Sequence, residues 1–433
     1  MRISVIGLGR LGAPLAAILA DSGAKVVGAD CDRALVARLA NGILPEIEPE
    51  LAALWHRAAG RIAVTASVAD AVSATEATFI LVPTPSTAEG GYSPAHLRDA
   101  IAEAGAAIAR KPGRHLVTIV STVMPGTMED VIAPALVQAA GRPLGDTLGL
   151  CFCPEFVALG AIVEGMRQPD LVLIGQSDAA AGNELEALLR PIWTREPAVR
   201  KMQFINAEIA KIAINGFVTA KISYANMLAE ICERLPGADA AIVTAAMGID
   251  ARIAPGYLQP GLGFGGPCFP RDNAALAALA ARVGTSPDLA EAAAAINLRQ
   301  PGHIVALVQR IVPSGTVGVL GLAYKGGSDV CEASQGIAIA AELAAAGHRV
   351  QVHDPVARPV LPPGVAQIDD AETCVRTSAI VVIATPWPDY GELGRDWLER
   401  PSGKLTIIDC WRMPGLRAHD GIVDLIYPGT AQS

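Results

Sequence analysis

The run Arg2-Ile-Ser-Val-Ile-Gly-Leu-Gly-Arg-Leu-Gly12 decides the fold. Its apolar, β-branched start predicts a short strand, and three glycines then follow at the G-x-G-x-x-G spacing. A helical run from Ala13 to Ser22 comes next, and a second strand pattern from Lys25 ends at Asp30. Strand, glycine-rich turn, helix, strand and acid in this order predict a dinucleotide-binding βαβ unit.

Each part of this unit has a chemical reason. Glycines allow the tight turn and a close approach to a pyrophosphate, and a helix N-terminus attracts its charge. Asp30 is placed to accept hydrogen bonds from ribose hydroxyls and to repel a 2′-phosphate, which favours NAD over NADP. A merely solvated strand end is the alternative for Asp30. We expect the cofactor-binding turn to comprise Gly7, Gly9, Arg10, Leu11 and Gly12.

Two more apolar runs, Thr78–Val82 and Leu116–Val120, predict further strands of the same sheet. In an open parallel sheet, ligands bind beyond the carboxyl ends of the strands. The residues that follow each run are therefore expected at the cofactor, although the threonines could be plain turn or cap residues. These residues are Pro83, Thr84, Ser121 and Thr122.

The βα pattern continues to Leu171–Gly175, which we interpret as the closing strand, and changes from about Pro191. Asn206–Glu233 predicts a long helix. Lys211 and Asn215 lie four residues apart and so share one helical face. A solvated lysine is the common alternative, but isoleucines flank this one.

Further helices are expected over Ala238–Met247 and onward to about Asn297. A second βα series then lacks the G-x-G-x-x-G spacing, which favours a different nucleotide-like ligand. The last residues, Pro428–Ser433, look frayed. The expected fold is α/β: two Rossmann-like βα domains joined by a central all-helical block with a long helix. The second series comprises strands over Gly315–Gly321, Arg349–Asp354, Ala379–Thr385 and Leu405–Asp409, and a helix over Ile337–Ala346.

Three domains are predicted from these boundaries: an NAD-binding domain over 1–195, a central helical domain over 196–300, and a C-terminal βα domain over 301–433. A chain of 433 residues is long enough for this division.

The segment Gly261-Leu-Gly-Phe-Gly-Gly-Pro-Cys-Phe-Pro-Arg-Asp272 carries the candidate nucleophile. Cys268 precedes a helical run and lies near Arg271, and both features favour a thiolate. A buried structural cysteine is the more common alternative. Glu155 follows a strand pattern and Pro154, where a carboxylate can move protons or contact a substrate.

The totals exclude several classes of protein. A net charge of −9 disfavours nucleic acid as a partner. The sequence contains no run of eighteen apolar residues, so no membrane span is expected. Eight dispersed cysteines indicate a reducing cytoplasm and suggest no metal site.

Taken together, the motifs resemble the UDP-glucose/GDP-mannose dehydrogenase family over nearly the whole chain. The motifs are Gly7–Gly12, Val82–Pro85, Ser121–Gly126, Pro154–Phe156, Lys211 with Asn215, Arg252, Gly263–Asp272 and Gly321–Lys325. The resemblance implies an enzyme that oxidises the primary alcohol of a nucleotide sugar to a carboxylate by two hydride transfers to NAD. It also implies a dimerising central helix and a C-terminal nucleotide-sugar domain.

The resemblance assigns roles to these residues. Cys268 would form a thiohemiacetal and then a thioester, while Lys211 and Asn215 would stabilise the oxyanion. Asp272, alternatively a helix N-cap, would hold a water with Thr122, and Glu155 would assist proton transfer. Arg252 would reach the substrate of a neighbouring subunit, Tyr257 would line the base pocket, Lys325 would contact the nucleotide sugar, and Arg271 the cofactor. The remaining substrate contacts would be Phe156, Val157, Leu159, Gly263, Phe264, Gly265 and Gly266.

The chain departs from the family pattern at four places. Leu159 stands where a second glutamate is usual, Glu332 replaces an arginine, Arg271 replaces a lysine, and Asp409-Cys-Trp replaces Asp-Gly-Arg. Because Cys268 and its predicted partners are intact, we interpret the chain as an active but divergent member.

The cysteine segment resembles the UDP-glucose branch most, and an N-acetylated UDP-sugar is the alternative substrate. Two other readings remain open: a β-hydroxyacid-type dehydrogenase, which would need neither the thiol nor the last domain, and a non-catalytic binder of nucleotide sugar and NAD. A homodimer or higher oligomer is expected.

Overall fold

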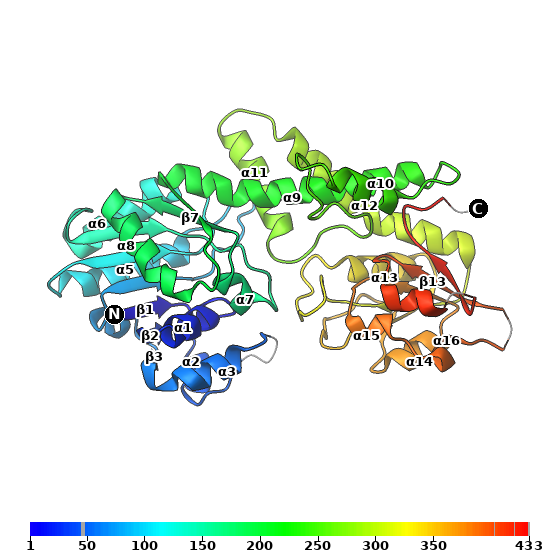
Figure 1. Ribbon diagram of the computed structural model, residues 1–433, viewed down its shortest axis with the longest axis horizontal. Helices are drawn as coiled ribbons and strands as arrows, with labels where there is room; N and C mark the ends of the chain where they lie inside the picture. Colours follow the sequence, from blue (N-terminus) through cyan, green and yellow to red (C-terminus); the bar gives the residue numbers. More distant parts are fainter. Residues whose placement is uncertain (45–47, 402, 420, 432–433) are drawn as a thin grey trace. The chain divides into compact units, whose positions relative to one another are not determined.

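The computed structural model describes residues 1–44, 48–401, 403–419 and 421–431. It divides into two compact units, Met1–Ala213 and Ile214–Ser433, each with its own sheet (Figure 1). The predicted α/β class is confirmed, with two Rossmann-like sheets and a helical block between them along the chain.

The first unit contains an eight-stranded sheet in the order β3-β2-β1-β4-β5-β6-β7-β8. Its first six strands follow the order 3-2-1-4-5-6, in which the carboxyl ends of β1 and β4 flank the point where the connections reverse. The strands are β1 Arg2–Ile6, β2 Lys25–Ala29, β3 Ile62–Thr65, β4 Ala77–Ile80, β5 His115–Ile119, β6 Leu148–Phe152, β7 Leu171–Gln176 and β8 Ala198–Met202.

The prediction that Leu171–Gly175 closes this sheet is wrong. β7 pairs with β6 in the antiparallel direction, and β8 lies beyond it as a parallel edge strand. β8 is short and largely exposed, with Arg200 and Lys201 on its surface, so it has no apolar run from which a strand could be predicted.

Helices cover both faces of the first sheet. One hydrophobic core unites the sheet with α1, α3, α7 and α8, and a second core unites it with α4, α5, α6 and the first turn of α9. These elements, together with α2 and three short turns, are α1 Gly12–Asp21, α2 Arg33–Ala40, α3 Leu51–Ala58, η1 Ala59–Arg61, α4 Val68–Ser73, α5 Ala95–Ala109, η2 Met128–Ile132, α6 Ala133–Ala140, α7 Ile162–Arg167, α8 Ala179–Leu189 and η3 Arg190–Ile192.

The long helix α9, Phe204–Cys232, starts in the first unit and continues into the second. Three more helices follow: α10 Ala240–Gly248, α11 Phe269–Arg282 and α12 Asp288–Ile311. Helical structure was predicted to end near Asn297, but α12 continues to Ile311 through a buried Pro301.

The second sheet has six parallel strands in the order β11-β10-β9-β12-β13-β14. Its strand order therefore repeats that of β1 to β6. One face packs on α12 and α13, and the other on α14, α15 and α16. The elements are β9 Thr316–Leu320, α13 Gln335–Ala345, β10 Arg349–His353, β11 Val365–Gln367, α14 Ala371–Arg376, β12 Ile380–Ile383, α15 Pro388–Gly391, α16 Arg395–Leu398, β13 Leu405–Asp409, η4 Pro414–His419 and β14 Val423–Ile426.

The prediction of a frayed tail over Pro428–Ser433 is wrong for the residues that the structure describes. The Gly429 amide donates to the Glu233 carboxylate at 2.8 Å, and the backbones of Thr430 and Asp239 pair in an isolated antiparallel β-bridge. The Arg412 guanidinium binds Asp239 and the Thr430 hydroxyl. The last two residues, 432 and 433, lie outside the described chain.

Candidate active site

The turn after β1 has the geometry of a pyrophosphate site. Gly7 has a φ of +89°, and a Cβ there would lie 2.5 Å from the Leu81 carbonyl oxygen. A Cβ on Gly12 would lie 1.8 Å from the Gly7 carbonyl oxygen, whereas one on Gly9 would meet nothing within 4 Å. Helix α1 starts here, and its N-cap residue Leu11 provides no side-chain hydrogen bond to the first amides of the helix. The turn therefore needs its glycines, leaves room beside Gly9, and fits the diphosphate of a dinucleotide.

Asp30 fastens the end of β2 to this turn. One carboxylate oxygen accepts the Leu8 amide at 2.7 Å, and the other accepts the Asp32 amide at 2.9 Å. Asp30 is therefore not a merely solvated strand end. Each oxygen has a second lone pair, so a ribose hydroxyl can still donate to it.

The loops after β4 and β5 are tied to each other. The Thr84 hydroxyl donates to the Thr122 carbonyl at 2.8 Å, and the Ser121 hydroxyl donates to the Val82 carbonyl at 2.6 Å. Both loops leave the same edge of the sheet as the glycine turn. Four predicted cofactor residues, Pro83 among them, thus lie on two connected loops.

Lys211 meets the loop after β6. It is 7% exposed, and its ammonium donates to the Glu155 carbonyl at 2.8 Å and lies 4.6 Å from the centroid of the Phe156 ring. A solvated helix lysine is therefore excluded. The contact brings together three residues that were predicted to contact the substrate.

The Glu155 carboxyl group has an unusual proton affinity. Its burial raises the pKa from 4.5 to about 7, and the nearby positive charge of Lys211 acts in the opposite direction. A carboxyl group that titrates near neutral pH can both take up and release a proton, as a general acid or base must. Downstream in the same loop, Val157 and Leu159 pack against the core of the first unit.

Sequence reasoning missed Glu208, one turn before Lys211 on α9. Its buried carboxylate accepts hydrogen bonds from the amides of Gly126 and Met128, which follow the Ser121–Thr122 loop. A charged residue on the same helical face as Lys211 was the available signal.

In the second unit, three side-chain amides hold the glycine-rich segment. Asn226 accepts from the Gly261 amide at 3.0 Å and donates to the Leu262 carbonyl. Asn297 binds both backbone groups of Phe264, and Gln300 donates to the Gly261 carbonyl at 2.7 Å. These residues were not predicted, because nothing in their local sequence distinguishes them from other buried amides.

The glycines of this segment are required by close packing. A Cβ on Gly265 would lie 2.4 Å from the Ala333 carbonyl oxygen, and one on Gly266 would lie 2.5 Å from the Tyr324 ring. The Gly266 amide donates to the Glu332 carbonyl at 2.8 Å. Glu332, which stands where the family usually has an arginine, thus contacts the glycine-rich segment through its backbone. Lys325 follows Tyr324 in the same loop.

Cys268 is the N-cap residue of α11 and is exposed. One turn later, the buried carboxylate of Asp272 accepts a hydrogen bond from the side-chain amide of Asn215 at 2.5 Å. The alternative role of Asp272 as an N-cap is wrong, because its own amide donates to the Cys268 carbonyl at 2.8 Å inside the helix. The structure thus places a thiol at a helix N-terminus, where the helix dipole favours a thiolate.

The other predicted residues of the second unit lie near this helix or on the surface. The Tyr257 ring packs edge-on against Phe269, the residue after Cys268, with centroids 5.9 Å apart. Arg271 is in the first turn of α11. Arg252 is highly exposed and forms an ion pair with Asp250 at 2.6 Å.

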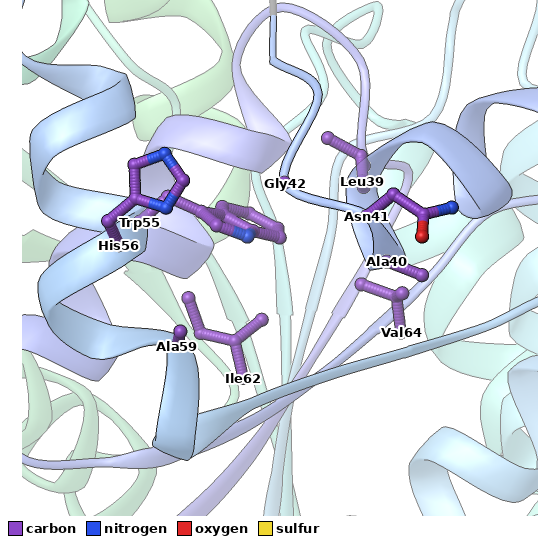
Figure 2. Close-up of a pocket in the computed structure, with 9 residues that line it drawn as sticks. All are labelled: Leu39, Ala40, Asn41, Gly42, Trp55, His56, Ala59, Ile62 and Val64. Atoms are coloured by element: carbon purple, nitrogen blue, oxygen red, sulfur yellow. The ribbon is translucent and has the colours of Figure 1, made fainter.

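A separate pocket of about 270 Å³ lies at the edge of the first sheet (Figure 2). Trp55 and His56 of α3 lie on one side of it, and Asn41 and Val64 lie on the other. None of the predicted site residues lines this pocket, which is formed by Leu39, Ala40, Asn41, Gly42, Trp55, His56, Ala59, Ile62 and Val64.

Two further findings concern only the residues that the structure describes. None of the helices there combines the length and the apolar character needed to cross a membrane. No three His, Cys, Asp or Glu side chains gather there in a way that would hold a metal ion.

The fold and the turn after β1 define a dinucleotide-binding α/β protein, and comparison with known proteins gives its family. Residues 1–193 match the NAD binding domain of the UDP-glucose/GDP-mannose dehydrogenase family, residues 205–299 its central domain, and residues 318–414 its UDP binding domain. The chain therefore belongs to this family of NAD-dependent nucleotide-sugar dehydrogenases. The predicted family, enzyme class and cofactor are confirmed.

Individual proteins similar to this chain are also named as dehydrogenases of nucleotide sugars. The chain is 38% identical to UDP-glucose 6-dehydrogenase AglM of Haloferax volcanii, over 91% of this chain and 93% of that protein. A UDP-glucose dehydrogenase from Pyrobaculum islandicum has a similar structure, with a TM-score of 0.88, 34% identity and coverage of 100% and 98%. A UDP-D-ManNAc dehydrogenase from Pyrococcus horikoshii superimposes with a TM-score of 0.84 at 26% identity, over 99% of both chains.

Proposed function

We propose that the protein oxidises UDP-glucose, or a closely related UDP-hexose, to the uronate with NAD as the electron acceptor. The observation that carries this proposal is the exposed thiol of Cys268 at the start of α11, one turn before the buried pair of Asp272 and Asn215. A dehydrogenase that stopped at the aldehyde would need no nucleophile.

The proposed reaction balances in three steps. The primary alcohol loses a hydride from its carbon and a proton from its oxygen, which leaves an aldehyde. The Cys268 thiolate adds to the carbonyl carbon of this aldehyde, and the resulting thiohemiacetal alkoxide loses a second hydride to become a thioester. Water then cleaves the thioester, which releases the sugar as a carboxylate together with a proton and restores the thiol. Bound NAD supplies the acceptor for each hydride.

The protein residues would manage charge and protons in these steps. Lys211 and the Asn215 amide would stabilise the oxygen while it carries negative charge. Asp272, which accepts a hydrogen bond from Asn215, would position the attacking water. Lys211 and Asn215 support this assignment because they lie four residues apart on α9.

The proposed domain roles and the sugar rest on the comparisons. Residues 1–195 would bind NAD, 196–300 would carry the nucleophile, and 301–433 would bind the nucleotide of the substrate, in line with the family domains matched there. UDP-glucose is favoured by the relatives named for it, and an N-acetylated UDP-hexosamine is the second candidate because of the similarity to the Pyrococcus horikoshii protein. All eight cysteines lie in the part of the chain that the structure describes and none is in a disulfide, which supports a cytoplasmic enzyme.

The test is to incubate the protein with NAD and a panel of UDP- and GDP-hexoses, with and without N-acetyl groups. We expect UDP-glucose to give two NADH per sugar and the uronate as the product. Preferred turnover of an N-acetylated sugar would replace UDP-glucose by the second candidate. One NADH per sugar with release of aldehyde would refute the thioester route.

We predict that activity depends on the ionisation of Glu155. Alcohol oxidation releases protons, so the carboxylate form is the useful one. Because the pKa of Glu155 lies at about 7 rather than 4.5, kcat should rise as the pH increases through about 7. The measurement is the pH profile of kcat for the wild type and for Glu155→Gln.

Glu155→Gln should lower kcat and remove the titration near pH 7. The matched control is Glu164→Gln, an exposed position in the first turn of α7, which should keep both the rate and the profile of the wild type. An unchanged profile in Glu155→Gln would show that another group is responsible.

We also propose that the enzyme is a homodimer that pairs through α9. Phe217, Tyr224 and Ile231 recur every seven residues on this helix and are 64%, 44% and 47% exposed. A seven-residue apolar repeat is the pattern by which helices pair. The exposed side chains of Ile242 on α10 and of Ile249, the residue after its end, add further apolar surface.

Phe217→Glu is therefore expected to shift the protein from dimer to monomer, because it places a charge in an apolar contact. The measurement is molar mass by light scattering across a range of protein concentrations. Val360→Glu introduces the same charge at an apolar residue that is 99% exposed in a loop, and it should leave the mass unchanged. A dimer that persists in Phe217→Glu would exclude this face.

A further inference from the structure

Glu208 is a buried anion on the first half of α9. Its side chain is fully buried, and its two carboxylate oxygens accept hydrogen bonds from the amides of Gly126 at 2.7 Å and Met128 at 2.8 Å. Burial raises the pKa of Glu208, and the two amide hydrogen bonds act in the opposite direction. A buried carboxylate without hydrogen-bond partners costs free energy, and so do buried amide donors without an acceptor. Because breaking these hydrogen bonds would incur both costs, Glu208 holds the two amides firmly in place.

The partners of Glu208 belong to the loop that follows β5. This loop contains Ser121 and Thr122, which are tied in turn to the loop after β4 by the Ser121 and Thr84 hydroxyls. The carboxylate is thus the link between helix α9 and two loops that carry predicted NAD contacts. All of these contacts lie within the first unit.

One turn further along α9, Lys211 makes the complementary contact. Its ammonium donates to the Glu155 carbonyl and lies over the Phe156 ring, so it holds the loop after β6. A single turn of one helix therefore anchors two adjacent loops, one by an anion that binds amides and the other by a cation that binds a carbonyl.

We propose that Glu208 is a positioning residue, which fixes the Ser121–Thr122 loop relative to Lys211 so that NAD binds in register with the reacting carbon. The catalytic part of this inference rests on the proposed function. The NAD-binding part does not, because it concerns the cofactor alone. The expected signature is weaker NADH binding and a lower kcat, with unchanged affinity for the UDP moiety.

The test uses Glu208→Gln in the full-length protein. The glutamine oxygen can accept one amide, but its NH₂ group would face the other donor, so one charge-assisted hydrogen bond is lost. Such a bond contributes about 1.5–3 kcal/mol, which at about 1.36 kcal/mol per tenfold corresponds to a change of about 10- to 160-fold. We expect an increase of this size in the dissociation constant of NADH, measured by fluorescence without any sugar, and faster hydrogen exchange over residues 121–128.

The controls separate positioning from general damage. UDP affinity, measured by calorimetry, should change less than about twofold, and Glu164→Gln should match the wild type in every assay. Glu208→Asp keeps the charge on a shorter side chain. The same measurements are made on this variant if Glu208→Gln does not fold. Unchanged NADH affinity and unchanged exchange over 121–128 would overturn the inference, as would a parallel loss of NADH and UDP affinity. If the wild type binds NADH but oxidises no sugar, the proposed function fails while this test still stands.

Discussion

A Cys268→Ser enzyme will form no uronate above background, a loss of more than about 10³-fold. A serine hydroxyl is not ionised near neutral pH and is a much weaker nucleophile than a thiolate, so it cannot replace a thiolate that adds to the aldehyde. The first oxidation does not need the nucleophile and can continue slowly. The measurement is product analysis by mass spectrometry together with the NADH yield per sugar.

Two comparisons make this result specific. Cys331→Ser removes a partly buried thiol whose contact is the Asp329 carbonyl at 3.6 Å, and it should retain wild-type activity. Trapping the wild-type enzyme with acid during turnover should give a peptide around Cys268 that carries the mass of the sugar. An undiminished uronate yield in Cys268→Ser would remove the thioester from the mechanism.

The second large effect is expected for Lys211→Met, which should lower kcat by about 10²- to 10³-fold. Methionine keeps an unbranched apolar chain on the helix but removes the charge that would face the developing alkoxide. Because this charge would act mainly in the transition state, the KM for the nucleotide sugar should change little. Steady-state kinetics with both substrates varied would separate the two constants.

Lys201→Met is the matched control. Lys201 lies on the edge strand β8 and pairs with Glu186 at 2.6 Å, away from the loops after β4, β5 and β6. It should keep kcat within about twofold, as surface ion pairs contribute little. A higher KM with an unchanged kcat in Lys211→Met would instead assign the lysine to ground-state binding.

Local sequence pattern was sufficient for the elements on which the fold depends. The predicted strand before the glycines is β1, and it ends at Ile6 because its β-branched run is closed by a turn that only glycines allow. The strand β8 was missed, since a largely exposed edge strand with two adjacent positive charges, Arg200 and Lys201, has no apolar run to reveal it. The end of α12 was misplaced because Pro301 and Gly302 look like a helix stop, while the packing of the buried helix overrides their low propensity.

The candidate site was predictable only in its reactive residues. Cys268, Lys211 and Asp272 stand out by chemical type and spacing. The residues that hold the loops do not, because each acts on backbone far away in the sequence: Glu208 and Gly126 are 82 residues apart, and Asn226 and Gly261 are 35 apart. Such long-range hydrogen bonds depend on how the elements pack, which spacing alone does not specify.

The bound tail has a practical consequence for producing this enzyme. Gly429 and Thr430 join Glu233, Asp239 and Arg412, so the chain end acts as a strap across the junction between α9 and α10. An affinity tag fused directly to Ser433 would begin only three residues after Thr430 in the sequence. Truncation before Pro428 would remove the contacts of Gly429 with Glu233 and of Thr430 with Asp239 and Arg412. A purification handle is therefore better placed before the exposed Met1, or after a long, flexible spacer at the other end.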